Sequence, residues 1–589
     1  MSMMMTSINN SNITDAQTEA FMECFNHLLA LGNDSFRFPK SVATFKRRSN
    51  LDALCTDGIK YFAVCTKYHK LFPPKESPTE DEFICNQPLT NACYVPTKSG
   101  KFCNGVVYKM SEGAKLKPIA QKEYPYCSII ATLKKSFFRR GFANKVIEWK
   151  SRHVVEGFLL DLYDATNFPE FKTSPSDNTP FVSESDYNLL LTLNIDWFSP
   201  FNNNHSVGCI YLTIQNITKS GGRDDKENMI LVGVIPGPSE PPTTAINHYL
   251  EPLVDDLLML LEGVEMKMIF RDGSIKVEKV KACLGTVSSD LPATKKLAGS
   301  KSFNSSYGCH LCKTFFPRID CPGNKRDYCQ WDCDNWIKRT IEETRADSEA
   351  WLKAKTAKER ENLENQNGVR YSVLFRLPYF SYDLIAIEPM HALYLGVFKT
   401  VLRKIVPPNG FKAIQEHMQQ YFDFNPYAPG GPMSKNLTKD DLGYIKAVEL
   451  KDLMTTMAPS ILRPLLETDT YKEVMLLIKA LRLLDGHAIR ISDIDEVHQN
   501  LLTFAKSYQA RYKNHSVPPN FHFMLHLREC IRRFGPISCF WGFSFERNNL
   551  YIKNITTNHK QGFEKTYMRR MQSIIFAHDS EIVQHYTST

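Results

Sequence analysis

The stretch that most constrains the fold of this chain is residues 188–201, which read NLLLTLNIDWFSPF. The apolar run is typical of a buried strand, and the Ser-Pro pair that follows it marks a turn. The strand delivers a single carboxylate, Asp196, close to its end. The other predicted elements are therefore placed relative to Asp196.

Further strands and a helix follow this stretch. Alternating runs of apolar residues and turn residues predict two strands, a helix and a strand pair at residues 209–217, 229–238, 246–263 and 267–290. The strand pair ends at Asp290, and Pro292 lies in the first turn of the next helix. The order strand-strand-strand-helix-strand is the opening of an RNase-H-like fold. We therefore predict an α/β chain with an RNase-H-like core, with Asp196 on its first strand and Asp290 just past its fourth.

Such a core needs a third carboxylate on a late helix, and two glutamates compete for this role. Glu546 lies in the aromatic segment FWGFSFERNNL, whereas Glu388 lies in AIEPMHALYLG. Since Pro389 suggests a helix start, Glu388 also has a plain capping role. Three carboxylates would hold two Mg²⁺ or Mn²⁺ ions about 3.5–4 Å apart, because these cations prefer oxygen ligands. An ordinary surface or capping carboxylate is the alternative for each acid.

Four further side chains predict a structural zinc site. Cys309 and Cys312 form the motif GCHLC, and His522 and His526 lie one helical turn apart. Two thiolates and two imidazoles are a common ligand set for tetrahedral Zn²⁺, which would join the two ends of a helical segment. Alternatively, the histidines are ordinary core residues and the two cysteines pair with nearby thiols, which are Cys321, Cys329 and Cys333.

The N-terminal part holds a looser set of cysteines. Zinc would let a short segment without a core of its own fold, and buried structural thiols are the alternative. Tyr68 stands where a CxxC pair would have its second cysteine. The candidate ligands are Cys65, His69, Cys85, Cys93 and Cys103.

A basic and aromatic stretch follows at residues 134–152. Interleaved Lys, Arg, Phe and Trp suit contacts with a phosphate backbone and stacking on bases. More often, such a run is an amphipathic helix with its apolar face on the core. Near Glu546, Trp541 and Phe545 raise a similar choice between stacking on a flipped base and simple packing, of which packing is the commoner.

With 589 residues, the chain exceeds the size at which one core usually stops growing, so several domains are expected. A net charge of +8 permits a polyanionic partner without requiring one. No long apolar run predicts a membrane span, and the N-terminus lacks the features of a secretory signal. We predict a disordered lead over residues 1–40 and a Cys-rich candidate zinc- and DNA-binding region over residues 41–150. The first part of the core covers residues 151–300, an α-helical insertion covers residues 301–520, and the last part of the core covers residues 521–589.

Several segments resemble, in the same order, the transposases of CACTA (En/Spm-like) elements and their fungal and animal relatives in the Kyakuja/Dileera/Zisupton group. The likeness spans about residues 155–555 and is carried by LTLNIDWFSPF, MILVGVIPGPSEPPTTAINHYLEPLVDDL, SSDLPATKKLAG with GCHLC, IEPMHALYLG and PISCFWGFSFERNNL. The segment 60–105 also resembles the N-terminal zinc region of these proteins, from which Tyr68 departs.

This resemblance implies a DDE/D transposase that cleaves and joins DNA, with transposon terminal repeats and target DNA as its partners. In the related Transib and V(D)J recombinases, a CxxC follows the second Asp, and a His pair precedes the catalytic Glu across a helical insertion. The residues that match this layout, and that favour Glu546 over Glu388, are Asp290, Cys309, Cys312, His522, His526 and Glu546. Because transposases usually act as dimers or larger assemblies, we expect a homo-oligomer, located in the nucleus and without a membrane partner.

Two other functions stay open at this point. A host protein derived from a transposase could keep the fold as a catalytically silent DNA-binding or scaffold protein. A structure-specific nuclease on the same fold would cleave DNA without joining it. The presence of all three candidate acids, Asp196, Asp290 and Glu546, disfavours the silent protein.

Overall fold

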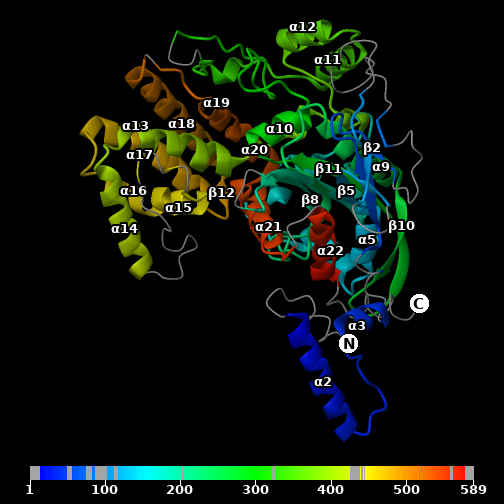
Figure 1. Ribbon diagram of the computed structural model, residues 1–589. Coiled ribbons are helices and arrows are strands. Elements are labelled where there is room, and N and C mark those ends of the chain that lie inside the picture. The colour runs from blue at the N-terminus through cyan, green and yellow to red at the C-terminus, as the bar shows by residue number, and fades with distance from the viewer. Residues whose placement is uncertain are drawn as a thin grey trace.

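In the computed structural model, helices surround one large curved sheet in a mixed α/β arrangement (Figure 1). The structure describes residues 14–48, 53, 56–73, 83–85, 103–111, 117–201, 205–320, 325–424, 438, 442, 445–513, 515–557 and 562–576. Within these ranges, eight strands form the sheet, and in spatial order they are β10 (Val264–Ile269), β11 (Ile275–Val287), β7 (Asn188–Phe198), β8 (Val207–Ile214), β9 (Met229–Ile235), β5 (Glu123–Cys127), β1 (Ile59–Val64) and β2 (Leu71–Phe72).

The centre of the sheet follows the predicted order of elements. β7 pairs antiparallel with β8, and β8 pairs antiparallel with β9. The chain then forms helix α9 (Ile246–Glu262) and the hairpin of β10 and β11. β11 returns beside β7 and runs parallel to it, with Val287 opposite Leu193. The carboxyl ends of β7 and β11 therefore lie side by side at one edge of the sheet.

Both faces of the sheet are covered, which explains why β8 and β9 are buried along their whole length. On one face, Ile210 and Leu212 pack in a core that also contains the apolar stripe of α9. On the other face, Cys209 and Tyr211 pack with two late helices, α21 (Phe543–Lys553) and α22 (Phe563–Phe576). The last helices of the chain thus cover one face of the central strands β8 and β9.

The N-terminal segments differ from the predicted domain order in two ways. Residues 15–31, in the part predicted to be a disordered lead, form helix α2 (Asp15–Leu31), which Thr14 caps, while residues 1–13 lie outside the described residues. Together with α3 (Val42–Arg48), α2 lies at one end of the molecule (Figure 1). Strands β1, β2 and β5 of the Cys-rich region extend the large sheet. This region therefore shares the sheet of the core.

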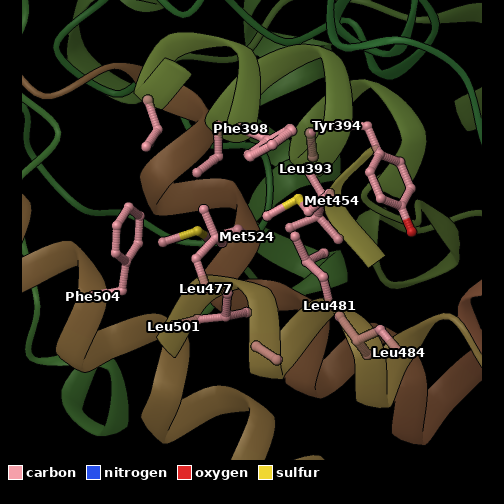
Figure 2. Close-up of a cluster of buried hydrophobic side chains, with 14 of the residues drawn as sticks. Leu393, Tyr394, Phe398, Met454, Leu477, Leu481, Leu484, Leu501, Phe504 and Met524 are labelled. Atoms are coloured by element: carbon pink, nitrogen blue, oxygen red, sulfur yellow. The ribbon is translucent and has the colours of Figure 1, made fainter. Parts of the chain in front are cut away.

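A helical layer lies beside the sheet and is built mainly from the predicted insertion (Figure 1). A large apolar cluster fills it, and Figure 2 shows Leu393, Phe398, Leu477, Leu501 and Phe504 meeting there from different helices. Its elements include the π-helices η7 (Met390–Phe398) and η9 (Leu453–Met457), and the α-helices α13 (Lys399–Ile405), α14 (Gly410–Phe424), α15 (Ala447–Asp452), α16 (Ala458–Leu462), α17 (Thr468–Leu484), α18 (Ile491–Arg511), α19 (Pro519–Phe523) and α20 (Leu527–Phe534).

The predicted insertion is not a single separate block. The charged segment after residue 340 forms two helices, α11 (Ile341–Lys353) and α12 (Ala357–Asn367). Residues 373–385 then return to the core of the sheet, where Ile385 forms a parallel bridge with Val287. Among the described helices, none is both long and apolar enough to cross a membrane.

One buried carboxylate joins α9 to the start of α5 (Ile129–Phe138). Oδ2 of Asp256 accepts hydrogen bonds from the hydroxyls of Tyr126 and Ser128, each at 2.7 Å, and from the N–H of Ile129 at 3.1 Å. The hydroxyl of Tyr126 keeps a second acceptor in the carbonyl of Pro252, but Ser128 and Ile129 lose theirs, so Asp256→Ala should lower the free energy of unfolding by about 2 kcal/mol, measured by urea denaturation. Asp255→Ala is the control, since the largely exposed ion pair of Asp255 with Arg376 should contribute less than about 1 kcal/mol. Equal losses in the two variants would contradict this role of Asp256.

Candidate functional site

The two predicted aspartates lie at the carboxyl ends of neighbouring parallel strands. Asp196 is near the end of β7, and Asp290 follows β11 as the N-cap of helix α10 (Leu291–Ala298). The two chain segments stay paired close to the acids, because the hydroxyl oxygen of Ser289 accepts the N–H of Ile195 at 2.9 Å. Parallel pairing thus brings together two acids that are far apart in the sequence.

Glu546 reaches the same place from helix α21. One turn further along this helix, Nδ2 of Asn549 donates to Oδ2 of Asp196 at 2.7 Å, and Oδ1 of Asn549 accepts the hydroxyl of Tyr211 at 2.8 Å. These bonds hold α21 against β7 and β8. The side chain of Glu546 remains 43% exposed, so it lies on the open side of the acids.

The pKa values of the three acids reflect burial and mutual repulsion. Burial raises the pKa of Asp196 to about 7; the charge of His391 opposes this rise, and the charges of Asp290 and Glu546 add to it. Burial also raises the pKa of Asp290 and of Glu546, and Glu388 contributes to both shifts. A divalent cation would relieve this excess of negative charge, so the donor set fits such an ion.

The rival glutamate, Glu388, is buried and fully engaged in hydrogen bonds. Its Oε1 accepts the N–H of Met390 at 2.9 Å and the N–H of Gly542 at 2.6 Å. Its Oε2 accepts the N–H of His391 at 2.7 Å and contacts Nδ1 of the same residue at 2.7 Å. Glu388 therefore binds the first N–H groups of η7 and holds the start of this helix next to α21.

His391 is a site residue that the sequence reasoning missed. Its Nε2 lies 3.7 Å from Oε1 of Glu546. Burial alone would lower the pKa of His391, but the hydrogen bond and charge of Glu388, together with Asp290 and Glu546, raise it to about 9. The signal was present in the motif IEPMHALYLG, where His391 follows Glu388 at helical spacing. The sequence pattern pointed only to the carboxylate of that motif, Glu388.

The four predicted zinc ligands come together in one buried cluster. Nε2 of His526 lies 3.5 Å from Sγ of Cys309, Nε2 of His522 lies 3.4 Å from Sγ of Cys312, and the two Nε2 atoms are 3.2 Å apart. A tetrahedral ion with Zn–S of about 2.3 Å and Zn–N of about 2.0 Å would set S···N near 3.5 Å and N···N near 3.3 Å. The cluster could therefore hold a structural metal ion such as zinc.

Neighbouring residues connect this cluster to the acids. The ring of Trp336 packs on both histidines, with centroid distances of 4.2 Å to His522 and 4.6 Å to His526. Nζ of the buried Lys295 lies 3.2 Å from Nδ1 of His310, which stands between the two cysteines. Since Lys295 belongs to α10, the helix that begins at Asp290 is anchored to the Cys/His cluster.

In the N-terminal region, three of the five candidate ligands meet. The Sγ atoms of Cys65, Cys85 and Cys103 lie within 4.8 Å of one another and are buried. Nδ1 of His69 instead makes a hydrogen bond of 2.9 Å with the hydroxyl of Tyr249, and Cys93 lies outside the described residues. The three thiols could also bind a structural metal ion.

The basic stretch at 134–152 is largely engaged with the protein itself. Phe137, Phe142 and Val146 are buried in the core, as an amphipathic helix requires. Three basic residues form ion pairs: Lys135 with Asp57, Lys150 with Asp186 and Arg152 with Asp164. Two others donate to backbone carbonyls: Arg139 to that of Glu227 and Lys145 to that of Gly221. Lys134, Arg140 and Lys150 are exposed, and Nε of Arg140 donates to the carbonyl oxygen of Arg271 at 3.1 Å.

Lys134 also lines a cleft of about 840 Å³ between α5, α9 and β10, together with Lys60 and Lys267. Acidic side chains, including Asp256, line the same cleft. A much smaller cavity of about 20 Å³ lies beside Glu388 and His391. The candidate active site is therefore identified by its three clustered carboxylates and not by the volume of a cavity.

The aromatic residues near Glu546 pack within the protein. Phe545 is buried, and its ring lies 6.1 Å from that of Tyr211. Trp541 packs edge-on against Phe543 at 5.0 Å, and Nζ of Lys219 lies 5.5 Å from its centroid. Packing accounts for both side chains.

Part of the chain matches a known family model. Residues 162–359 match the model described as transposase family tnp2, which supports a transposase family for this part of the chain. The matched range contains Asp196, Asp290, Cys309 and Cys312 and ends before Glu388. No curated protein matches the chain.

The Cys/His cluster predicts a measurable metal content. Cys312→Ser and His522→Gln should each lower the zinc content of the purified protein by about one equivalent per chain, because each removes one ligand of a four-ligand site. Elemental mass spectrometry measures this content. Cys24→Ser, which changes an exposed cysteine, should leave it unchanged. An unaltered zinc content in both cluster variants would exclude this site.

Proposed function

We propose that this chain is a DNA transposase, or a host protein derived from one, that cleaves DNA at transposon ends and joins the freed ends to target DNA. The observation that carries the proposal is the meeting of Asp196, Asp290 and Glu546 at one edge of the sheet. The family match of residues 162–359 supports the same class.

The core is proposed to be RNase-H-like. Its support is the antiparallel run β9-β8-β7 with β11 added parallel to β7, and acids at the ends of β7 and β11. The third acid, Glu546, comes from helix α21, which follows the helical layer in the sequence. The layout of the related Transib and V(D)J recombinases, in which a His pair precedes the catalytic Glu across a helical insertion, favours Glu546. The four hydrogen bonds of Glu388 also favour it, because they occupy both carboxylate oxygens.

Asp196, Asp290 and Glu546 would hold Mg²⁺ or Mn²⁺. When bound, such ions supply Lewis-acid activation of the attacking oxygen and stabilise the leaving oxygen. Asn549 fixes the direction of the Asp196 carboxylate, and the N–H of Ala293 fixes that of Asp290 at 2.7 Å. The exposed side of Glu546 leaves room for a phosphodiester.

Two displacements at phosphorus would follow in sequence. In the first, water attacks the phosphorus, the P–O3′ bond breaks, and a free 3′-OH and a 5′-phosphate result. In the second, that 3′-OH attacks a target phosphodiester, forming a new P–O3′ bond and releasing a target 3′-OH. The same acids would serve both steps, because each is an in-line displacement.

The remaining assignments rest on the family likeness and the clusters. Zinc at Cys309, Cys312, His522 and His526 would be structural, since all four ligand positions are filled by the protein. The DNA partners would be transposon terminal repeats and target DNA, with Lys134 and Arg140 available for phosphate contacts. A nuclear location and a homo-oligomer are proposed from the same likeness.

Removal of any one acid should abolish DNA cleavage. Asp196→Ala, Asp290→Ala and Glu546→Gln are each expected to lower the rate more than about 100-fold, because loss of a direct ligand should exceed the effect of losing an outer-shell partner. The rate is measured with Mg²⁺ or Mn²⁺ on DNA that carries terminal repeats of the element. Glu416→Gln, at an exposed acid of α14, is the control.

The same assay separates the competing functions. Cleavage with joining supports a transposase, whereas cleavage without joining identifies a structure-specific nuclease. DNA binding without any cleavage by the zinc-loaded wild-type protein identifies a silent scaffold. Activity that persists in Asp196→Ala would refute the assignment of the active site.

A further inference from the structure

We propose that His391 is a direct ligand of the divalent metal site, in addition to Asp196, Asp290 and Glu546. This inference rests on the proposed function, because it concerns the same metal site. It makes the site a mixed oxygen and nitrogen site, for which the expected ion is a transition metal such as Mn²⁺.

The hydrogen bonds of Glu388 fix the tautomer of His391. Each oxygen of Glu388 accepts a bond from a backbone N–H of η7, and Oε1 accepts a further one from Gly542. A carboxylate oxygen offers two lone pairs, so the remaining position on Oε2 belongs to the contact with Nδ1 of His391 at 2.7 Å. A carboxylate so surrounded by donors acts as an acceptor, and Nδ1 therefore carries the hydrogen. A metal ion that displaces the proton from Nε2 would then bind the Nε2 lone pair, which is the metal-binding position of the ring.

The position of Nε2 suits an ion shared with the acids. It lies 3.7 Å from Oε1 of Glu546, too far for a hydrogen bond. Two ligands about 2.1 Å from one ion lie about 3.0 Å apart at the octahedral angle of about 90° and about 3.6 Å apart at about 120°. A small shift of either side chain would therefore let both bind the same ion.

The backbone holds His391 rigidly in this place. His391 lies in the π-helix η7, and π-helical turns are frequent at functional sites. The side chain of Asn520 packs against this turn next to Gly396. A Cβ on Gly396 would come within 2.2 Å of Nδ2 of Asn520 and 2.6 Å of the carbonyl oxygen of His391. Glycine at position 396 thus leaves room for the amide that packs against this turn.

The arrangement matches the usual outer shell of a metal-bound histidine. Such a histidine almost always donates its other ring N–H to a carboxylate or carbonyl, which orients the ring and raises its basicity. Glu388 is that carboxylate here, so it would act as a positioning residue for His391 and not as a ligand itself. An imidazole ligand also shifts the preference of the site from Mg²⁺ toward Mn²⁺.

The test is Mn²⁺ binding to the purified, zinc-loaded full-length protein without DNA. Pulsed electron paramagnetic resonance of bound Mn²⁺ should show coupling to an imidazole ¹⁴N, and incorporation of ¹⁵N-histidine into the wild-type protein should change this coupling. His391→Gln should remove the coupling and raise the Kd for Mn²⁺ at least about tenfold, while Glu388→Gln should keep the coupling and raise the Kd about 10–100-fold. His417→Gln, at an exposed histidine of α14, is the control.

The outcomes separate this inference from the proposed function. If Mn²⁺ binds the wild type and binding is lost in Asp196→Asn, but no nitrogen coupling is present, the inference about His391 is overturned and the proposed function stands. In that case the imidazole ring of His391 would contact a DNA phosphate instead of a metal ion. If the wild type and Asp196→Asn bind Mn²⁺ equally weakly, the metal site itself is overturned. The ¹⁵N-histidine comparison needs no substitution, so a folding defect in His391→Gln cannot obscure the result.

Discussion

The parallel pairing of β7 and β11 is the interaction on which the rest of the site depends. Asp196 lies near the end of β7 and Asp290 follows β11, so the register of the ladder sets the distance between the two acids. A shift of one residue would turn the side chains of β7 to the opposite face of the sheet. The pairing is protected on both sides, because α9 covers one face and α21 and α22 cover the other.

Concentrating carboxylates at one edge of a sheet is unfavourable, and the surrounding residues limit the cost. Asn549 donates to Asp196, the N–H of Ala293 donates to Asp290, and Glu388 accepts N–H groups on both of its oxygens. The Cys/His cluster anchors α10 through Lys295 and His310 and joins the segment after Asp290 to the helices before Glu546. The acids are thus held by elements that come from distant parts of the chain.

Sequence reasoning predicted the parts of this structure that depend on local pattern. The apolar runs gave the order of strands and α9, and the Cys and His spacing gave the ligand cluster, because both depend on short-range periodicity or residue type. His391 and Asn549 were missed, since their roles depend on contacts with Glu388 and Asp196 that no local pattern reveals. The return of residues 373–385 to the core was missed for the same reason: short apolar segments do not indicate which layer they join.

The domain order also shows the limit of composition. A polar N-terminal segment suggested disorder, yet residues 15–31 form a capped helix. Its Met22 is buried in the same apolar cluster as the residues of α22. A Cys-rich segment suggested a separate domain, yet its strands β1 and β5 pair with each other and β5 continues the central sheet.

The late position of α21 has a consequence for synthesis on the ribosome. Strands β7 to β11 emerge early and can pair, but the helix with Glu546 and Asn549 leaves the exit tunnel only after the whole helical layer has been made. A nascent chain with a formed sheet would therefore hold two of the three acids, with Asp196 still lacking its amide partner. If the proposed function holds, an unfinished chain would therefore lack a complete active site until the final helices are in place.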